Sequence, residues 1–337
     1  MKKHFFIFSI YLSMALRVYW SNRKETLKLI SEINQMLKDK GYELSNQQIE
    51  RIEFYTIQSC ITNQWFSILR GKRPDTEEKL LALHVGAITP LLDDYTDDMK
   101  GTSEELFEVL NRTKEHGDSL ELTIGYLYHL IQKNSDEKFH AYINKTLESQ
   151  VASLSQNERK SLSERELKNI TNKKGGTSTL LYRKILKYPL KEGEEEAIFN
   201  LGYLLQLTND MFDIYEDYHN SQQTLFTSSS GLNPILQDYQ KLYKEMSIQF
   251  LDLDYDSYRI KRMLLEISAV ISRGLVCSKQ LLTLQEKRGG ELEIDKLSRK
   301  DLICDMEKPS NIWKSIKYSI QYYSLLQDLI KNRKSIE

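Results

Sequence analysis

The sequence predicts an all-α protein, and three features of its 337 residues lead to this prediction. Apolar residues recur at the three- and four-residue spacing of helices along almost the whole chain. Only 5 Pro and 14 Gly interrupt it, whereas the helix-favouring residues Leu, Lys and Glu are abundant. No stretch of useful length shows the alternation of a strand, and no repeat has a fixed period. We therefore expect a helical bundle.

Capping residues place the ends of the first helices. One helix is expected over residues 27–37, and a second begins after Ser45 and reaches Gly71. A third begins at Asp75, which stands three residues before Glu78, the spacing of a capping box. These helices follow one another without a linker rich in proline.

The later helices show the same pattern. One opens at Asp118, and a long one is expected from Glu194 to about Tyr218. Further helices are predicted over about 234–250, 256–287 and 310–332. Two breaks are predicted, one at the paired glycines 175–176 and one in the polar loop 221–231.

The N-terminal segment 1–20 has two lysines, an apolar run and a small-residue triplet. It fits either a docking helix or a short signal or anchor, although the apolar run is too short to span a bilayer. We assign residues 21–337 to a single α-helical domain.

Charge and cysteine content exclude several classes of function. The 47 basic and 48 acidic residues give a net charge of −1, so nucleic acid is not an expected partner. Cys60, Cys277 and Cys304 are odd in number and far apart, which fits neither a disulfide framework nor a zinc site. We expect a cytoplasmic protein and leave open a peripheral contact with a membrane.

The stretch Leu91–Met99, LLDDYTDDM, places four carboxylates within a long apolar helix. Asp93 and Asp97 are four residues apart and share a helix face, where like charges destabilise the helix. Pro90 is expected to kink the helix just before this cluster. The position is unfavourable without a cation, although a solvated acidic helix end is the simpler alternative.

A second acidic stripe occurs in QLTNDMFDIYED, where Asn209, Asp213 and Asp217 recur every four residues. Ligand sets made of oxygen alone suit a hard cation such as Mg²⁺, for which Mn²⁺ can substitute. Because Mg²⁺ is often completed by substrate phosphates, two such stripes facing each other predict several ions and a diphosphate ligand.

These two motifs resemble those of the class I isoprenoid synthase superfamily. QLTNDMFDIYED is similar to the second motif of the squalene/phytoene synthase family, and DDYTDD resembles its first motif. The resemblance implies an isoprenoid-synthase-like helical bundle around a central cavity, acting on an isoprenyl diphosphate. It implies that the metal ligands and catalytic residues are Asp93, Asp94, Asp97, Asn209, Asp213 and Asp217, with Asp210 and Glu216 as flanking acids.

The sequence also departs from that family. Pro90-Leu91-Leu92 replaces the arginine that commonly precedes the first motif, and YHNSQQTLFTSSS replaces the turn after the second. The resemblance therefore favours condensation of two isoprenoids, as in squalene or phytoene synthesis, over cyclisation of one by only a small margin.

Cations and aromatic side chains would complete such a site. Arginine and lysine bind diphosphate oxygens, and aromatic faces stabilise a carbocation away from water. The predicted diphosphate-binding residues are Arg70, Arg73, Lys174 and Arg183, with Lys72 and Lys173 as neighbours. The aromatic candidates, which fit a helical core equally well, are Trp65, Phe66, Tyr126, Tyr182, Phe212 and Tyr215.

Two alternatives of another class remain open. The pairs Glu137/His140 and Glu216/His219 have the Glu-x-x-His spacing of ferritin-like di-metal proteins. That reading leaves the two acidic motifs without a role. The second alternative is a non-catalytic helical scaffold whose acidic side chains only face solvent.

Overall fold

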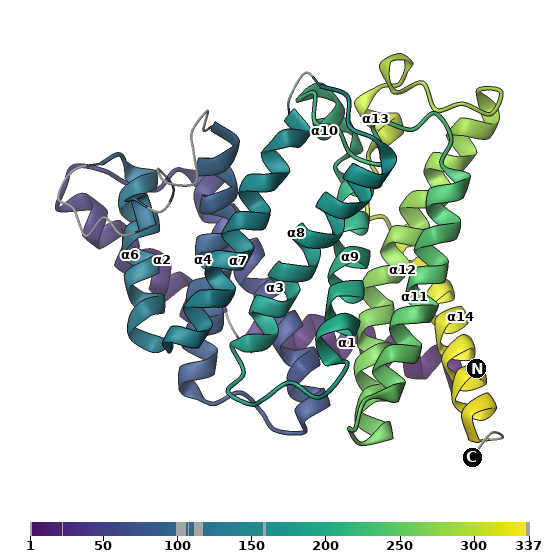
Figure 1. The fold of residues 1–337 in the computed structure, drawn as a ribbon, viewed down its shortest axis with the longest axis horizontal. Coiled ribbons are helices and arrows are strands. Elements are labelled where there is room, and N and C mark those ends of the chain that lie inside the picture. The colour runs from purple at the N-terminus through teal and green to yellow at the C-terminus, as the bar shows by residue number, and fades with distance from the viewer. Residues whose placement is uncertain are drawn as a thin grey trace. The chain divides into compact units, whose positions relative to one another are not determined.

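The prediction of an all-α protein is confirmed by the computed structural model, which is helical and has no strand in the residues it describes (Figure 1). These are residues 2–21, 23–98, 106, 108–110, 117–157 and 160–334. The described chain forms two compact units. Unit 1 comprises 1–12, 155–180 and 190–337, and unit 2 comprises 13–154 and 181–189. The assignment of 21–337 to one domain stays a prediction.

Unit 2 is built around α3 and α4, which pack along their length. Its helices are α2 (Arg23–Lys38), α3 (Asn46–Arg70), α4 (Thr76–Asp98), α6 (Ser119–Asn134) and α7 (Glu137–Ser153). One hydrophobic core joins them, with fully buried Ile33, Ile52 and Leu91 among its members. Burial of this apolar surface is the main force that holds the unit together.

Unit 1 contains α9 (Glu194–Phe212), α11 (Asn233–Asp252), α12 (Ser257–Lys287) and α14 (Pro309–Lys334). Its short elements are α10 (Ile214–His219), η2 (Ile294–Lys296), α13 (Arg299–Leu302) and all but the first residue of η1 (Leu154–Asn157). Two helices, α1 (Lys2–Ser21) and α8 (Glu164–Lys184), contribute residues to both units. The Tyr239 hydroxyl joins α9, α11 and α12, since it lies 2.8 Å from Thr208 Oγ1 and donates to the Ile271 carbonyl at 3.1 Å.

The predicted helix ends are confirmed where they depend on local capping. Ser45 forms a capping box with Gln48 at the start of α3, and Gly71 ends that helix at φ 74°. Asp75 and Glu78 exchange the two hydrogen bonds of a capping box at the start of α4. The α4 helix then continues through Pro90.

The predicted break at Gly175-Gly176 is wrong, because α8 is continuous there. A Cβ added to Gly175 would overlap the backbone carbonyl of Gly202 in α9, and one added to Gly176 would overlap the Phe199 ring. The two glycines therefore allow α8 and α9 to pack closely. Their backbone N–H groups are not freed for an anion.

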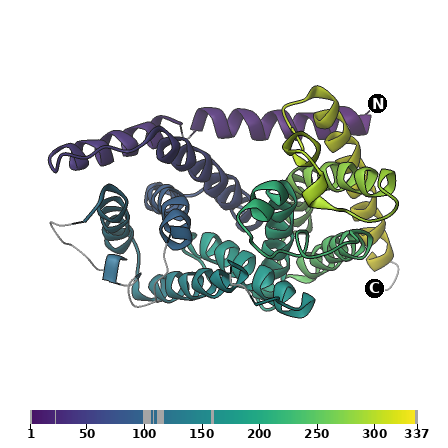
Figure 2. The same ribbon diagram turned by 90° about the horizontal axis from the view of Figure 1, so that it is seen from above.

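The N-terminal helix α1 packs on α12 and α14 through its first half (Figure 2). The Tyr11 hydroxyl lies 2.9 Å from Ser272 Oγ, 2.7 Å from Ser315 Oγ and 2.9 Å from Ser319 Oγ. Ile7, one helical turn before Tyr11, is also buried. Within the described residues, no helix is long and apolar enough to cross a membrane.

Candidate functional site

The first acidic motif lies on the last turns of α4 beside the first half of α3. The Tyr55 hydroxyl donates to Asp93 Oδ2 at 3.5 Å, and Arg51 Nη1 lies 3.1 Å from Asp94 Oδ1. Arg51 also donates to the Pro90 carbonyl at 3.4 Å. All four side chains that meet here are half-buried. The motif therefore has a cationic partner within unit 2, supplied by another helix.

Close packing of α3 and α4 sets this arrangement. The two helices are antiparallel, with the Ser59 hydroxyl donating to the Ala82 carbonyl at 2.7 Å. A Cβ on Gly86 would lie 2.9 Å from the Thr56 Cα, so a side chain there would push the helices apart. Because Arg51 is one helical turn before Tyr55, both residues reach the acidic end of α4.

Asp97 belongs to α4 by its backbone, but its side chain lies outside the described residues, as does that of Asp98. The residue before it, Thr96, is buried and accepts a hydrogen bond from Gln150 of α7 at 3.4 Å. The prediction that Asp97 is a metal ligand therefore stays a prediction.

Tyr182 lies next to the first motif. Its hydroxyl is 3.1 Å from Thr89 Oγ1, one helical turn before Asp93. Burial raises the pKa of Tyr182 to about 12, and the charge of Asp93 acts in the same direction. This hydroxyl therefore stays protonated at neutral pH and is a neutral hydrogen-bond donor.

The second acidic motif is at the junction of α9 and α10. The helix expected over Glu194 to Tyr218 is interrupted, because α9 ends at Phe212 and Asp213 has φ −92° and ψ 5°. Asn209 Nδ2 donates to Asp213 Oδ2 at 2.7 Å, and the Asp217 N–H donates to the Asp213 carbonyl at 2.8 Å. The three predicted ligands thus remain neighbours along the chain despite the break.

The short helix α10 contacts both α9 and α13. Ile214 is fully buried, and Glu216 forms an ion pair with Arg299 of α13 at 3.4 Å. Asn209 is exposed, whereas Asp213 and Asp217 are half-buried.

Asp210, next to Asn209, is 5% exposed. Burial raises the pKa of Asp210 to about 7, while the hydrogen bond from Gln206 Nε2 at 2.9 Å and the charge of Lys174 oppose this rise. Lys174, a predicted diphosphate-binding residue on α8, is half-buried. The structure therefore brings Lys174 close to the second motif in unit 1.

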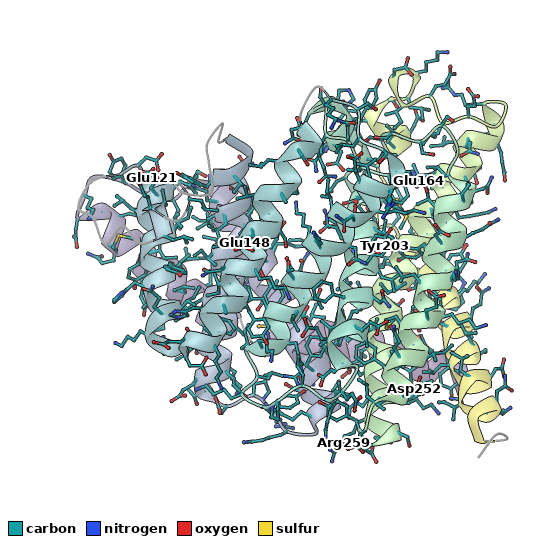
Figure 3. All side chains as sticks on the ribbon, in the orientation of Figure 1. Glu121, Glu148, Glu164, Tyr203, Asp252 and Arg259 are labelled. Atoms are coloured by element: carbon teal, nitrogen blue, oxygen red, sulfur yellow. The ribbon has the colours of Figure 1, made fainter. Side chains whose placement is uncertain are left out.

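The same part of unit 1 contains a second basic contact. Lys168 of α8 lies 2.9 Å from Glu164 Oε1 and 2.7 Å from Asp238 Oδ2 of α11. Figure 3 labels Glu164 and Tyr203 in this part of unit 1. Burial raises the pKa of Tyr203 to about 12. Lys168 is thus paired with two carboxylates of its own unit.

The other predicted diphosphate-binding residues have structural partners. Arg183 is 0% exposed; it donates to the carbonyls of Tyr188 at 3.3 Å and Pro189 at 3.1 Å and lies 3.6 Å above the Tyr188 ring. Arg70 pairs with the buried Glu78 at 2.5 Å. Lys72, Arg73 and Lys173 are exposed. The binding of diphosphate by any of these residues stays a prediction.

The aromatic candidates divide between fully buried and half-buried positions. Trp65 and Phe66 are 2% and 0% exposed, as expected for a helical core. Tyr215 lies 4.1 Å from the His219 ring, and the Arg299 guanidinium is 5.8 Å from the Tyr215 centroid. Tyr126 and Phe212 are half-buried.

No three His, Cys, Asp or Glu side chains among those described are arranged to hold a metal ion. The Glu-x-x-His residues have other contacts: His140 Nε2 lies 3.0 Å from Ser135 Oγ, and His219 Nδ1 lies 2.8 Å from the Tyr215 carbonyl. The donor sets of the two acidic motifs are nevertheless oxygen atoms, the kind that Mg²⁺ prefers.

Arg51 and Tyr55 are the functional candidates that the sequence did not reveal. Their i, i+4 spacing on a helix is visible, but only the packing of α3 on α4 places them at Asp93 and Asp94.

Of the comparisons with family models, curated sequences and solved structures, the one with solved structures gives matches. No protein-family model and no curated protein sequence matches this chain. Among solved structures, the chain is similar to a crystal structure of a dehydrosqualene synthase in complex with a ligand, at 14% sequence identity and a TM-score of 0.38. The similarity covers 93% of this chain and 99% of that one.

Proposed function

We propose that this protein is a Mg²⁺-dependent isoprenoid synthase that ionises an isoprenyl diphosphate and condenses the resulting allylic cation with a second isoprenoid. The observation that carries the proposal is the pair of acidic motifs. Asp93 and Asp94 lie together on α4, and Asn209 and Asp213 are hydrogen-bonded neighbours at the end of α9. In this proposal each set supplies oxygen ligands for Mg²⁺.

The ligand chemistry supports this assignment. Asp93, Asp94 and Asp97 supply carboxylates from one motif, and Asn209, Asp213 and Asp217 supply an amide and two carboxylates from the other. These oxygens fit Mg²⁺, with Mn²⁺ as a second hard ion. Bound Mg²⁺ supplies neutralisation of the charge that develops on the departing diphosphate.

Cationic side chains complete the diphosphate contacts. Arg51 lies beside Asp94, and Lys174 acts electrostatically on Asp210, so both motifs have a partly accessible cation nearby. Guanidinium and ammonium groups donate charge-assisted hydrogen bonds to phosphate oxygens. Arg73, which is exposed, is a further diphosphate ligand in this proposal. Arg70 and Arg183 serve chiefly to stabilise unit 2 through their buried contacts.

The allylic cation requires protection from water. Aromatic and apolar side chains exclude water and stabilise positive charge through their ring faces. Tyr182 is placed next to Asp93 and keeps its proton, so it does not add a negative charge to the site. We assign it to orienting the substrate through its hydroxyl.

Product analysis tests the proposal. Purified protein is incubated with Mg²⁺ and the C10, C15, C20 and C25 isoprenyl diphosphates, with and without a nicotinamide reductant. Condensation yields a product with the carbons of two isoprenoid units, whereas the alternative terpene cyclase reaction yields a product with those of one. Folded protein that releases diphosphate from none of the four substrates would overturn the proposal.

A further inference from the structure

The N-terminal helix α1 carries a row of exposed apolar side chains. Phe8, Leu12 and Leu16 follow one another at intervals of four residues, so they share one face of the helix. Their exposed fractions are 51%, 48% and 49%. Single exposed apolar residues are common on protein surfaces, whereas a continuous row of them marks an interaction site. We call these three residues the α1 row.

Another face of α1 is already packed against unit 1. Ile7 is 1% exposed. The Tyr11 hydroxyl lies within hydrogen-bond distance of the hydroxyls of Ser272, Ser315 and Ser319. These serines also contact one another, since Ser272 Oγ lies 2.8 Å from Ser315 Oγ and accepts a hydrogen bond from Ser319 at 3.0 Å. The network fixes the rotation of α1 on α12 and α14, so the α1 row stays at the surface.

The charge of α1 indicates what covers the row. The helix has no Asp or Glu, and its basic residues are Lys2, Lys3 and Arg17. A further cation lies beside it, because Lys261 Nζ of α12 is 5.6 Å from the centre of the Tyr323 ring, which is 6.0 Å from the Phe6 ring of α1. A surface that is both apolar and positively charged fits a bilayer with anionic headgroups, which offers hydrocarbon and negative charge together.

A second copy of this chain fits the α1 row less well. Two α1 helices packed through their rows would bring only like charges together, because neither helix has a carboxylate. A stable protein–protein interface also takes about 20–30 residues from each partner. The α1 row alone is too small for such an interface.

We propose that the α1 row binds the surface of an anionic phospholipid bilayer, with α1 lying in the plane of the membrane. The three apolar side chains enter the boundary between headgroups and acyl chains, and the basic charge of α1 attracts the anionic headgroups. Because Tyr11 fixes α1 on α12 and α14, the helix brings unit 1 to the membrane. This binding goes beyond the proposed isoprenoid reaction and does not depend on it.

Sedimentation of the full chain with sucrose-loaded vesicles tests the proposal. Vesicles of phosphatidylcholine with phosphatidylglycerol are compared with vesicles of phosphatidylcholine alone. The chain binds the anionic vesicles more tightly, and added salt weakens this binding because it screens the charges. Phe8→Ser and Leu12→Ser each lower the partition coefficient about 10-fold, since each removes a half-exposed apolar side chain from the bilayer boundary.

Phe54 of α3 provides the matched control, because its side chain is 57% exposed and does not belong to the α1 row. Phe54→Ser binds the vesicles as the unchanged chain does. The three substitutions are at exposed positions, so each variant keeps the denaturation midpoint of the unchanged chain.

Equal binding by the unchanged chain, Phe8→Ser and Leu12→Ser would overturn the proposal, and so would equal binding to the two kinds of vesicle. A dimer in solution that Leu12→Ser dissociates, together with no vesicle binding, would overturn it in favour of a second copy of the chain.

Discussion

Gly175 of α8 and Gly202 of α9 are so close that a Cβ added to either would overlap the carbonyl group of the other. The contact is within unit 1, and it positions Lys174 near Asp210 of the second acidic motif. The packing role of such a glycine cannot be recognised from the residues next to it in the sequence. It becomes clear only when the pairing of the two helices is known.

Replacing Gly202 by alanine should destabilise unit 1. Overpacking typically costs about 1–3 kcal/mol, which exceeds the gain of about 1 kcal/mol from replacing glycine in a helix. Chemical denaturation would measure the loss. Gly231→Ala is the matched control, since a Cβ there meets nothing within 4 Å. Equal stability of the Gly202→Ala and Gly231→Ala variants would contradict the packing role.

The Arg70–Glu78 pair should contribute strongly to the stability of unit 2. Glu78 is 1% exposed and accepts hydrogen bonds from Arg70, from the Asp75 N–H and from the Lys187 N–H. Removing one partner of a buried pair costs about 3–5 kcal/mol, so Glu78→Gln should lower the free energy of unfolding by this order.

The neighbouring Glu77 provides the control for that substitution. It pairs with Lys187 at the surface, where an ion pair contributes about 0–1 kcal/mol. Glu77→Gln should therefore change the denaturation midpoint little. If both substitutions cost the same, Glu78 would not have the assigned role.

Stability should fall in mild acid because of His84. Burial lowers the pKa of His84 from 6.5 to about 4, and its Nδ1 has no hydrogen-bond partner among the described residues. The unfolded chain takes up a proton below pH 6.5, while the folded chain stays neutral until about pH 4. The contribution of neutral His84 to the free energy of unfolding is therefore fully present above pH 6.5. It is lost as the pH falls from 6.5 to about 4, and the loss is about 3 kcal/mol at most.

Denaturation at a series of pH values measures this effect. His84→Leu should remove the decrease between pH 6.5 and 4 that comes from this side chain, leaving the contribution of the carboxylates. An unchanged pH dependence in His84→Leu would show that His84 is protonated in the folded chain.

Arg51 should affect activity more than stability. It pairs with Asp94 at 3.1 Å, and both side chains are partly exposed. Arg51→Gln should reduce diphosphate release about 10- to 100-fold, as expected when a residue that orients a metal ligand is lost, and should change stability by less than about 1 kcal/mol. Arg51→Lys keeps the charge and should restore part of the rate. A rate unaffected by Arg51→Gln would remove Arg51 from the site.

Local signals in the sequence predict much of the helical framework. Ser45, Gly71 and Asp75 mark the helix ends because capping depends on a few adjacent residues. Contacts between helices are not local, so Gly175 was predicted as a break although it permits close packing with α9. The interruption at Asp213 likewise has no glycine or proline to mark it in the sequence.

The acidic motifs themselves were predictable from spacing, but their partners were not. Asn209 and Asp213 are four residues apart, so their contact follows from helix geometry. Arg51 is near the start of α3 and Asp94 is near the end of α4, so most of both helices separates them in the sequence. Only the antiparallel packing of α3 and α4 brings the two side chains together.

Diphosphate release from an isoprenyl diphosphate, measured with and without Mg²⁺, tests the central claim most directly. Release should stop when Mg²⁺ is chelated, and it should fall by roughly two orders of magnitude, or about 3 kcal/mol, in Asp94→Asn and in Asn209→Ala. Asp254→Asn, at a side chain that is 94% exposed, should release diphosphate at the unchanged rate. Equal rates in all three variants, or release that is indifferent to Mg²⁺, would contradict the account.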